Sequence, residues 1–180
     1  MAEEPFFSHP LASIVDSFGR LCDRAAHDGV NIALEFSPYA QVSHLTFAWQ
    51  VVVDADRQNG GVLLDSWHYF RSGSQHEQLS RIPVDRIFSV QLGDVLPEAL
   101  GDLKTEGRHH RQFPGAGAGD LTGLLATLAA MNYHSSISVE VFSDALAALP
   151  ARRAAHDGMS AARATLRSAT LALPAASAES

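Results

Sequence analysis

Hydrophobic residues follow two patterns along the chain, one with the spacing of a helix and one of short continuous apolar runs. The helical spacing predicts helices over residues 11–25, 45–57, 77–81, 120–131 and 152–171, and Gly29 ends the first of them. The apolar runs predict strands over residues 30–36, 62–65, 86–92 and 137–142, with a very short further strand at Phe113. We expect the small, polar segment 174–180 to be a disordered tail.

Strands and helices therefore alternate along residues 1–173, which we interpret as one domain. Such alternation is typical of an α/β fold, either a barrel or an open doubly wound sheet. The strands are continuously apolar, as expected of a parallel sheet that is covered on both faces. The glycine-rich segment 114–119 precedes a helix but does not follow a strand of the required kind, so it does not indicate a dinucleotide site.

The overall charge narrows the classes of partner. The chain has 180 residues, of which 46% are hydrophobic, and a formal net charge of −7. This acidic balance argues against nucleic acid or an anionic membrane as the partner, because phosphate binding needs a basic surface. The single cysteine, Cys22, excludes a disulfide within the chain. We find no signal peptide and no apolar run of membrane-spanning length, and we expect a cytoplasmic protein.

Four of the predicted strands end in an oxygen-bearing side chain of the kind that binds metal ions. These residues are Glu35, Asp65, Gln91 and Glu140. The carboxyl ends of parallel strands lie at one edge of the sheet, so we expect the four side chains to converge. Like charges held that close repel one another unless a cation neutralises them. Oxygen ligands of this set suit Mg²⁺, Mn²⁺ or a similar hard cation, and separate ion pairs with arginines are the alternative.

Other polar and aromatic residues near these strand ends have two interpretations each. His68, three residues after Asp65, can return over the strand ends as an acid or base, or it can be an ordinary loop histidine. Arg108 and Arg111 can bind an anionic group of a substrate, or lie on a solvated loop. Trp67 can form the floor of a pocket, although aromatic packing beneath a loop is commoner.

Taken together, these segments resemble the xylose isomerase-like barrel superfamily, which includes sugar phosphate isomerase/epimerases, myo-inosose dehydratase and endonuclease IV. The matching stretches are residues 31–36, 61–73, 82–94, 108–119 and 136–144. In that superfamily the third metal ligand is most often histidine. The variant with Gln91, followed by Arg-His-x-Arg-x-Phe-Pro-Gly, is most similar to the bacterial 3-dehydroshikimate dehydratases. The acidic charge and the lack of strand-end histidines argue against the endonuclease branch.

This resemblance implies a (β/α)₈ TIM-barrel fold in which Glu35, Asp65, Gln91 and Glu140 hold one divalent ion, Mn²⁺, Mg²⁺ or Co²⁺. It also implies that His68, Glu35 and Glu140 are the catalytic residues. Arg108, Arg111 and Trp67 would then contact the substrate, a small polyhydroxylated carbonyl compound. The expected activity is isomerisation or epimerisation through a metal-stabilised enolate, with 3-dehydroshikimate dehydratase-type lyase chemistry as the alternative.

The resemblance also implies that the barrel is incomplete. A full barrel has eight strands in about 250 residues, and we predict about five βα units, corresponding to family strands 4–8. The chain is therefore either an enzyme of this family, or an inactive fragment or metal-binding half that needs a partner. We expect that partner to be another copy of the chain or the missing half of the barrel.

Overall fold

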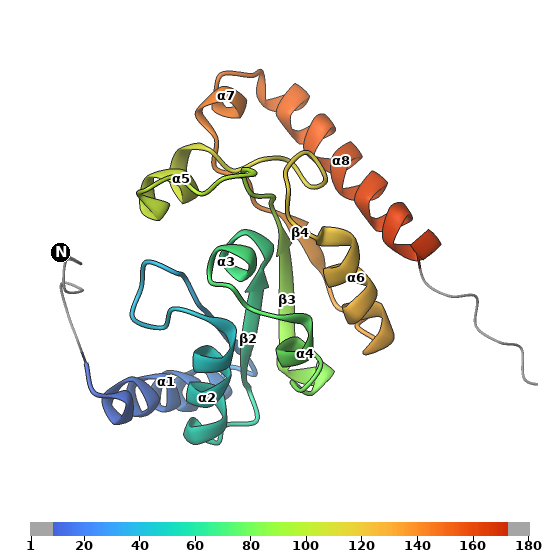
Figure 1. The fold of residues 1–180 in the computed structure, drawn as a ribbon. Helices are drawn as coiled ribbons and strands as arrows, with labels where there is room; N and C mark the ends of the chain where they lie inside the picture. Colours follow the sequence, from blue (N-terminus) through green and yellow to red (C-terminus); the bar gives the residue numbers. More distant parts are fainter. Residues whose placement is uncertain (1–8, 173–180) are drawn as a thin grey trace, which may run out of the picture.

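In a computed structural model, residues 9–172 form one parallel sheet covered by helices (Figure 1). The four strands are β1 (Ile32–Glu35), β2 (Gly60–Asp65), β3 (Ile87–Leu92) and β4 (Ile137–Val139). They pair in the order β1-β2-β3-β4, so each strand lies beside its neighbour in the sequence. A sheet of this order, with a helix on each connection, is one sector of an α/β barrel. The α/β fold with parallel strands is thus confirmed.

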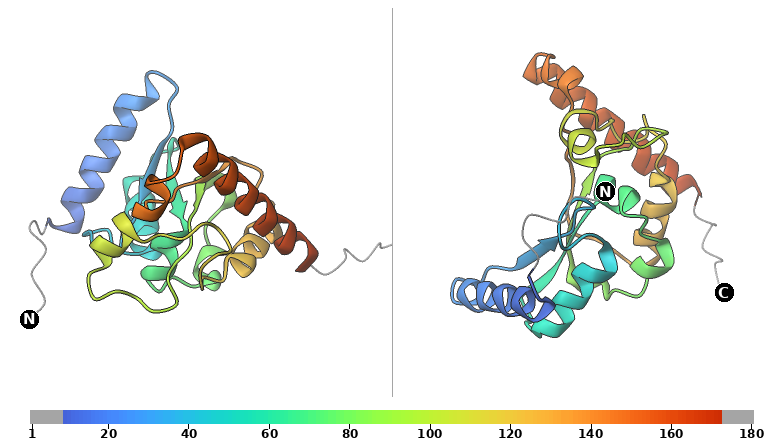
Figure 2. Two further views of the ribbon diagram at one scale, coloured as in Figure 1. Left: turned by 90° about the horizontal axis from the view of Figure 1, so that it is seen from above. Right: turned by 60° about the vertical axis from the view of Figure 1, so that its left-hand side comes forward.

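The helices lie along the sheet in the same order as the strands. They are α1 (Leu11–Ala26), α2 (Leu45–Ala55), α3 (Ser66–Arg71), α4 (His76–Leu79), α5 (Leu103–His109), α6 (Leu121–Ala130), α7 (Asp144–Ala147) and α8 (Ala151–Ala172), with a 3₁₀ turn at Val84–Arg86. Helices α1, α2, α4, α6 and α8 pack each against the next and form one curved layer (Figures 1 and 2). No helix within residues 9–172 is long and apolar enough to cross a membrane.

The core lies between this helical layer and the sheet. Val62, Leu64 and Val90 of the strands are fully buried there, together with Val51 of α2 and Leu124 of α6. These residues belong to the apolar runs and helical stripes from which the elements were predicted. The helix ends also follow the sequence signals. Gly29, three residues beyond the end of α1, adopts a φ of 66°, a conformation that favours glycine.

We expected about five βα units, and therefore about five strands. Within the described residues the structure has four strands. The residues around Phe113 make only two isolated antiparallel bridges, between Asp94 and Gln112 and between His110 and Ser143. A strand cannot continue there because Pro114 has no N–H and because the glycine-rich segment after it folds back onto the Asp94 carboxylate.

Strand β4 is also shorter than the predicted strand 137–142, since the last residue of β4 is Val139. Beyond it, the carbonyl of Phe142 accepts a hydrogen bond from Arg111 N at 3.0 Å, in place of a continuing ladder with β3. Helices α3, α5 and α7 were not predicted. The expected disordered tail, 174–180, lies outside the described residues, and the domain boundary at residue 173 stays a prediction.

Candidate metal centre at the strand ends

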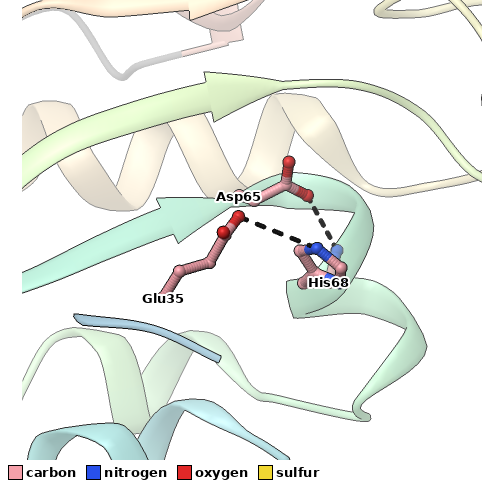
Figure 3. Close-up of side chains that lie close together, drawn as sticks. All are labelled: Glu35, Asp65 and His68. Atoms are coloured by element: carbon pink, nitrogen blue, oxygen red, sulfur yellow. Dashed lines mark hydrogen bonds and ion pairs between the residues drawn. The ribbon is translucent and has the colours of Figure 1, made fainter. Parts of the chain in front are cut away.

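Two acids and a histidine converge at the carboxyl ends of β1 and β2. Glu35 is the last residue of β1, Asp65 is the last residue of β2, and His68 lies in the first turn of α3 (Figure 3). One ligand atom from each of the three lies within 4.8 Å of the other two. His68 Nε2 is 3.7 Å from Glu35 Oε1. The three side chains point toward a common position from separate elements, which is the geometry of a small binding centre.

The position of His68 follows from how β2 passes into α3. Helix α3 begins directly after Asp65, whose carboxylate oxygen Oδ1 accepts a hydrogen bond from His68 N at 2.9 Å as the cap of the helix. The first helical turn therefore carries the imidazole back over the end of the strand. This is the return that the Asp-x-x-His spacing predicted, although the sequence did not reveal that a helix produces it.

Gln91 and Glu140 extend this group across β3 and β4. Gln91 is in β3 next to the strand end, and Glu140 follows the last residue of β4. Gln91 Nε2 donates to Glu140 Oε1 at 3.2 Å. Gln91 Oε1 is buried and has no hydrogen-bond partner within residues 9–172. A buried carbonyl oxygen without a donor is costly, and a cation bound beside it would supply the missing interaction.

Arg111 places a guanidinium group among these residues. Its Nη1 donates to Asp65 Oδ2 at 2.8 Å and to Glu140 Oε2 at 3.3 Å. Its Nη2 is 3.2 Å from His68 Nε2. Because arginine can only donate, Nε2 of His68 must accept in this contact, which puts the imidazole proton on Nδ1. The pairing of acids with an arginine, which the sequence left open as an alternative, is thus present for Asp65 and Glu140.

The backbone around Arg111 explains how this side chain reaches the strand ends. The residue after Arg111, Gln112, pairs with Asp94 just beyond β3, and Arg111 N donates to the carbonyl of Phe142 beyond β4. The segment therefore crosses the ends of both strands. The guanidinium carbon lies 5.1 Å from the ring centre of Trp67 and 5.2 Å from that of Phe142, distances at which a cation interacts with an aromatic face.

Of the other two residues that we expected at the substrate, Trp67 packs against Arg111 and His68, and Arg108 lies apart from the acidic group. Trp67 is fully buried, and its ring lies so close to Gly107 that a Cβ there would be 2.9 Å from it, which matches the packing interpretation of this residue. Arg108 is exposed and lines a cleft beside β4 instead of the acidic group. No observation tests whether either residue contacts a substrate, and both roles stay predictions.

The acidic residues shift one another's protonation. Burial, followed by the charges of Asp65 and Glu140, raises the pKa of Glu35 to about 7. Burial and the charge of Asp65 also raise the pKa of Glu140. Burial lowers the pKa of His68 to about 4, so that its imidazole is neutral at pH 7. When ionised, the three carboxylates carry more negative charge than the single guanidinium group of Arg111 neutralises. Their oxygen-rich donor set fits a hard divalent cation.

A buried aspartate that the sequence analysis missed holds the glycine-rich segment in place. Both oxygens of Asp94 accept backbone N–H groups, from Val95 at 2.8 Å, Gly115 at 3.0 Å, Gly117 at 3.1 Å and Gly119 at 2.9 Å. The available signal was an acid directly after a strand and Gly93, followed later by alternating glycines. Asp94 acts through the backbone, because it fixes the segment next to Arg111.

Known proteins resemble this chain in sequence and in fold. Residues 4–168 match the family described as xylose isomerase-like TIM barrel. The chain belongs to this family. Among curated proteins of the family, it is 37% identical over 149 residues to a 3-dehydroshikimate dehydratase of Pseudomonas aeruginosa, covering 82% of this chain and 23% of the relative. It is 36% identical over 132 residues to an inosose isomerase of Bacillus subtilis, covering 72% of this chain and 46% of the relative.

Solved structures share the fold of this chain. The IOLI protein, whose crystal structure contains a zinc atom, superimposes with a TM-score of 0.81 at 31% identity, over 87% of this chain and 56% of that one. A fusion of a xylose isomerase-like barrel with a 4-hydroxyphenylpyruvate dioxygenase gives a TM-score of 0.80 at 32% identity, over 88% and 25% of the two chains. The chain thus spans between about a quarter and about half the length of these relatives.

Proposed function

We propose that this chain carries the metal-binding part of an isomerase or epimerase that acts on small polyhydroxylated carbonyl compounds. The observation that carries the proposal is the convergence of Glu35, Asp65 and His68, whose ligand atoms lie within 4.8 Å of one another at the ends of adjacent parallel strands. With Glu35 and Asp65, the unpartnered oxygen of Gln91 and the nearby Glu140 complete the set of groups that would hold the ion, and His68 lies beside them as the acid or base. The bound ion would supply Lewis-acid polarisation of a carbonyl oxygen.

The residues themselves have the properties that proton transfer next to a carbonyl requires. A neutral imidazole at pH 7 can accept a proton, and the lowered pKa of His68 keeps it neutral. Glu35, 3.7 Å away, has a pKa raised to about 7 before any ion binds, which is the range in which a carboxyl group exchanges protons readily. Arg111 adds a fixed positive charge that would favour a substrate oxygen as negative charge develops on it.

Dehydration is the second candidate function, because removal of the same α-proton can be followed by loss of a β-hydroxyl group. It is favoured by Gln91, which stands where most members of the superfamily have histidine, and by the 37% identity to a 3-dehydroshikimate dehydratase. Isomerisation is favoured by the 36% identity to an inosose isomerase. Both reactions begin with the same proton transfer, so one experiment can test them together.

The test is incubation of the chain with Mn²⁺ in D₂O, with 3-dehydroshikimate and an inosose as separate substrates. NMR follows exchange of the α-proton, and ultraviolet absorbance follows formation of an aromatic product. We expect exchange by the parent chain and by His76→Gln, a histidine paired with Tyr69 outside the centre. We expect no exchange by His68→Gln. A folded, Mn²⁺-loaded parent chain without exchange, or equal exchange in both variants, would contradict the proposal.

A further inference from the structure

A buried serine joins the ends of β2 and β3 beyond the last paired residues of the two strands. The ladder between them ends at Asp65 and Gln91. Ser66 follows Asp65 directly and is already the first residue of helix α3, so its backbone has left the ladder. Its hydroxyl oxygen nevertheless accepts a hydrogen bond from Gly93 N at 2.9 Å and donates one to Gly93 O at 2.5 Å. The side chain of Ser66 therefore continues the pairing of the two strands where the backbone of β2 no longer can.

A hydroxyl group suits this position because a single oxygen atom can both donate and accept a hydrogen bond. Ser66 is fully buried, and Gly93 is buried as well. The hydroxyl group thus gives the N–H and C=O groups of Gly93 a partner in place of solvent, and a buried backbone group without a partner is costly. Replacing the hydroxyl by an apolar group would remove both hydrogen bonds at once.

The same glycine lies against the end of β4. The last paired residues of β3 and β4 are Leu92 and Val139, and one step further Glu140 N donates to Leu92 O at 3.0 Å. A Cβ atom added to Gly93 would lie 2.8 Å from Glu140 O, so the close approach of the two backbones requires glycine at position 93. The ends of β2, β3 and β4 therefore meet at Gly93, and Ser66 supplies the contact from β2.

These contacts lie directly beside the groups that would bind the ion. Asp65 is the residue before Ser66. Gln91 lies two residues before Gly93, and Glu140 packs against this glycine. Mg²⁺ requires oxygen ligands at about 2.0–2.1 Å in a nearly octahedral arrangement. The spacing of the strand ends therefore decides whether the ligands from all of the strands can reach such a small ion together.

We propose that Ser66 is a positioning residue of the metal centre, which sets the distance between Asp65 and the ligands on β3 and β4 without contacting the ion. This inference rests on the proposed function, because it assumes the metal centre. With the hydroxyl group present, the strand ends are close enough for a small ion. Without it, the ends of β2 and β3 separate. Ca²⁺ is then disfavoured less than Mg²⁺, because it accepts oxygen ligands at about 2.3–2.6 Å in flexible arrangements.

The experiment compares the parent chain with Ser66→Ala. Mn²⁺ bound to each chain is displaced with Mg²⁺ and, separately, with Ca²⁺, and electron paramagnetic resonance measures the Mn²⁺ released. We expect Mg²⁺ to bind Ser66→Ala about tenfold more weakly than the parent, and Ca²⁺ binding to change by about threefold or less. The deciding quantity is the ratio of the two affinities, because a general loss of stability would weaken the binding of both ions equally.

Two further variants separate the spacing of the strand ends from other effects. Ser66→Cys fills the space of the serine but forms only weak hydrogen bonds, so its affinity ratio should fall as in Ser66→Ala. Ser74→Ala is the matched control, because Ser74 is 8% exposed and its hydroxyl oxygen accepts from Leu45 N at 3.3 Å, outside the acidic group. Its affinity ratio should equal that of the parent. Circular dichroism confirms that each variant is folded.

Amide hydrogen exchange gives a second measurement, which needs no metal ion. Gly93 N should exchange faster in both Ser66 variants and at the parent rate in Ser74→Ala. Unchanged exchange at Gly93 would overturn the inference, and so would an affinity ratio that is equal in the parent and the Ser66 variants or falls equally in Ser74→Ala. A folded parent chain that does not bind Mn²⁺ would overturn the metal centre as well. The behaviour of the parent therefore distinguishes the two failures.

Discussion

Replacing Arg111 by methionine would remove the guanidinium group from the acidic centre while keeping most of the apolar length of the side chain. Arg111 is 2% exposed, and its partner Asp65 is fully buried at 2.8 Å. Removing one member of a buried ion pair costs about 3–5 kcal/mol, because the remaining charge is left uncompensated. For a domain of this size, that corresponds to a fall in melting temperature of about 6–20 °C.

Metal binding should offset part of this loss. Without Arg111, the carboxylates of Asp65 and Glu140 have no cation beside them, so a bound divalent ion should stabilise the variant more than the parent. An ion at about a hundred times its dissociation constant adds about 2.7 kcal/mol to the stability of a chain that binds it only when folded. We therefore expect a gain of at least this size for Arg111→Met in Mn²⁺, and a smaller gain for the parent chain under the same conditions.

The matched control is Arg71→Met. Arg71 forms an ion pair with Glu106 at 2.6 Å, with side chains 11% and 0% exposed, away from the strand ends. This variant should also be destabilised, but Mn²⁺ should stabilise it no more than it stabilises the parent. Urea unfolding in EDTA and in Mn²⁺ measures all three chains. The reasoning would be refuted if Arg111→Met cost less than about 1 kcal/mol, or if Mn²⁺ stabilised both arginine variants equally.

Three further changes test other parts of the site. In EDTA, the raised pKa of Glu35 means that its carboxyl group binds a proton more tightly in the folded chain than in the unfolded chain. The stability that results is complete below pH 4.5 and is lost as the pH rises to about 7. The urea midpoint should fall more over this range in the parent than in Glu35→Gln, where only Glu140 keeps a raised pKa, and equal profiles would contradict the prediction. Asp94→Asn should leave at least one buried N–H of the glycine-rich segment unpaired, at a cost of about 1–3 kcal/mol. Hydrogen exchange at Gly115, Gly117 and Gly119 should then be faster. Unchanged exchange would show that the carboxylate is not required. In Gly107→Ala the new Cβ would lie 2.9 Å from the ring of Trp67, so the ring must move, at a cost of about 1–3 kcal/mol. An unchanged tryptophan emission spectrum, together with the stability of the parent chain, would contradict this prediction.

The strand-end residues could be predicted because the signals for them are local. Glu35 and Asp65 each follow a short apolar run, and parallel strands bring their carboxyl ends to one edge of the sheet. The return of His68 over the strand end also follows from a spacing of three residues. The sequence did not show that Asp65 both caps α3 and pairs with Arg111, since the second role depends on a contact between residues 46 positions apart.

The position of Arg111 could not be predicted because it depends on long-range backbone pairing. The segment that carries it is held by Asp94 on one side and by Phe142 on the other, and neither contact leaves a periodic pattern in the sequence. The same pairing explains why the apolar Phe113 does not start a strand. The short helices α3, α5 and α7 were missed for a related reason, since helices of so few residues carry little of the 3.6-residue periodicity.

The most direct test of the metal centre is a titration of the metal-free chain with Mn²⁺, followed by electron paramagnetic resonance. The structure predicts one ion bound per chain, loss of that binding in Asp65→Asn, and weaker binding in Gln91→Leu, which removes the unpartnered oxygen. Asp144→Asn, an exposed acid paired with His109, should bind as the parent does. A folded parent chain that leaves Mn²⁺ free in solution, or an Asp65→Asn variant that binds it equally well, would contradict the assignment of the metal centre to these strand ends.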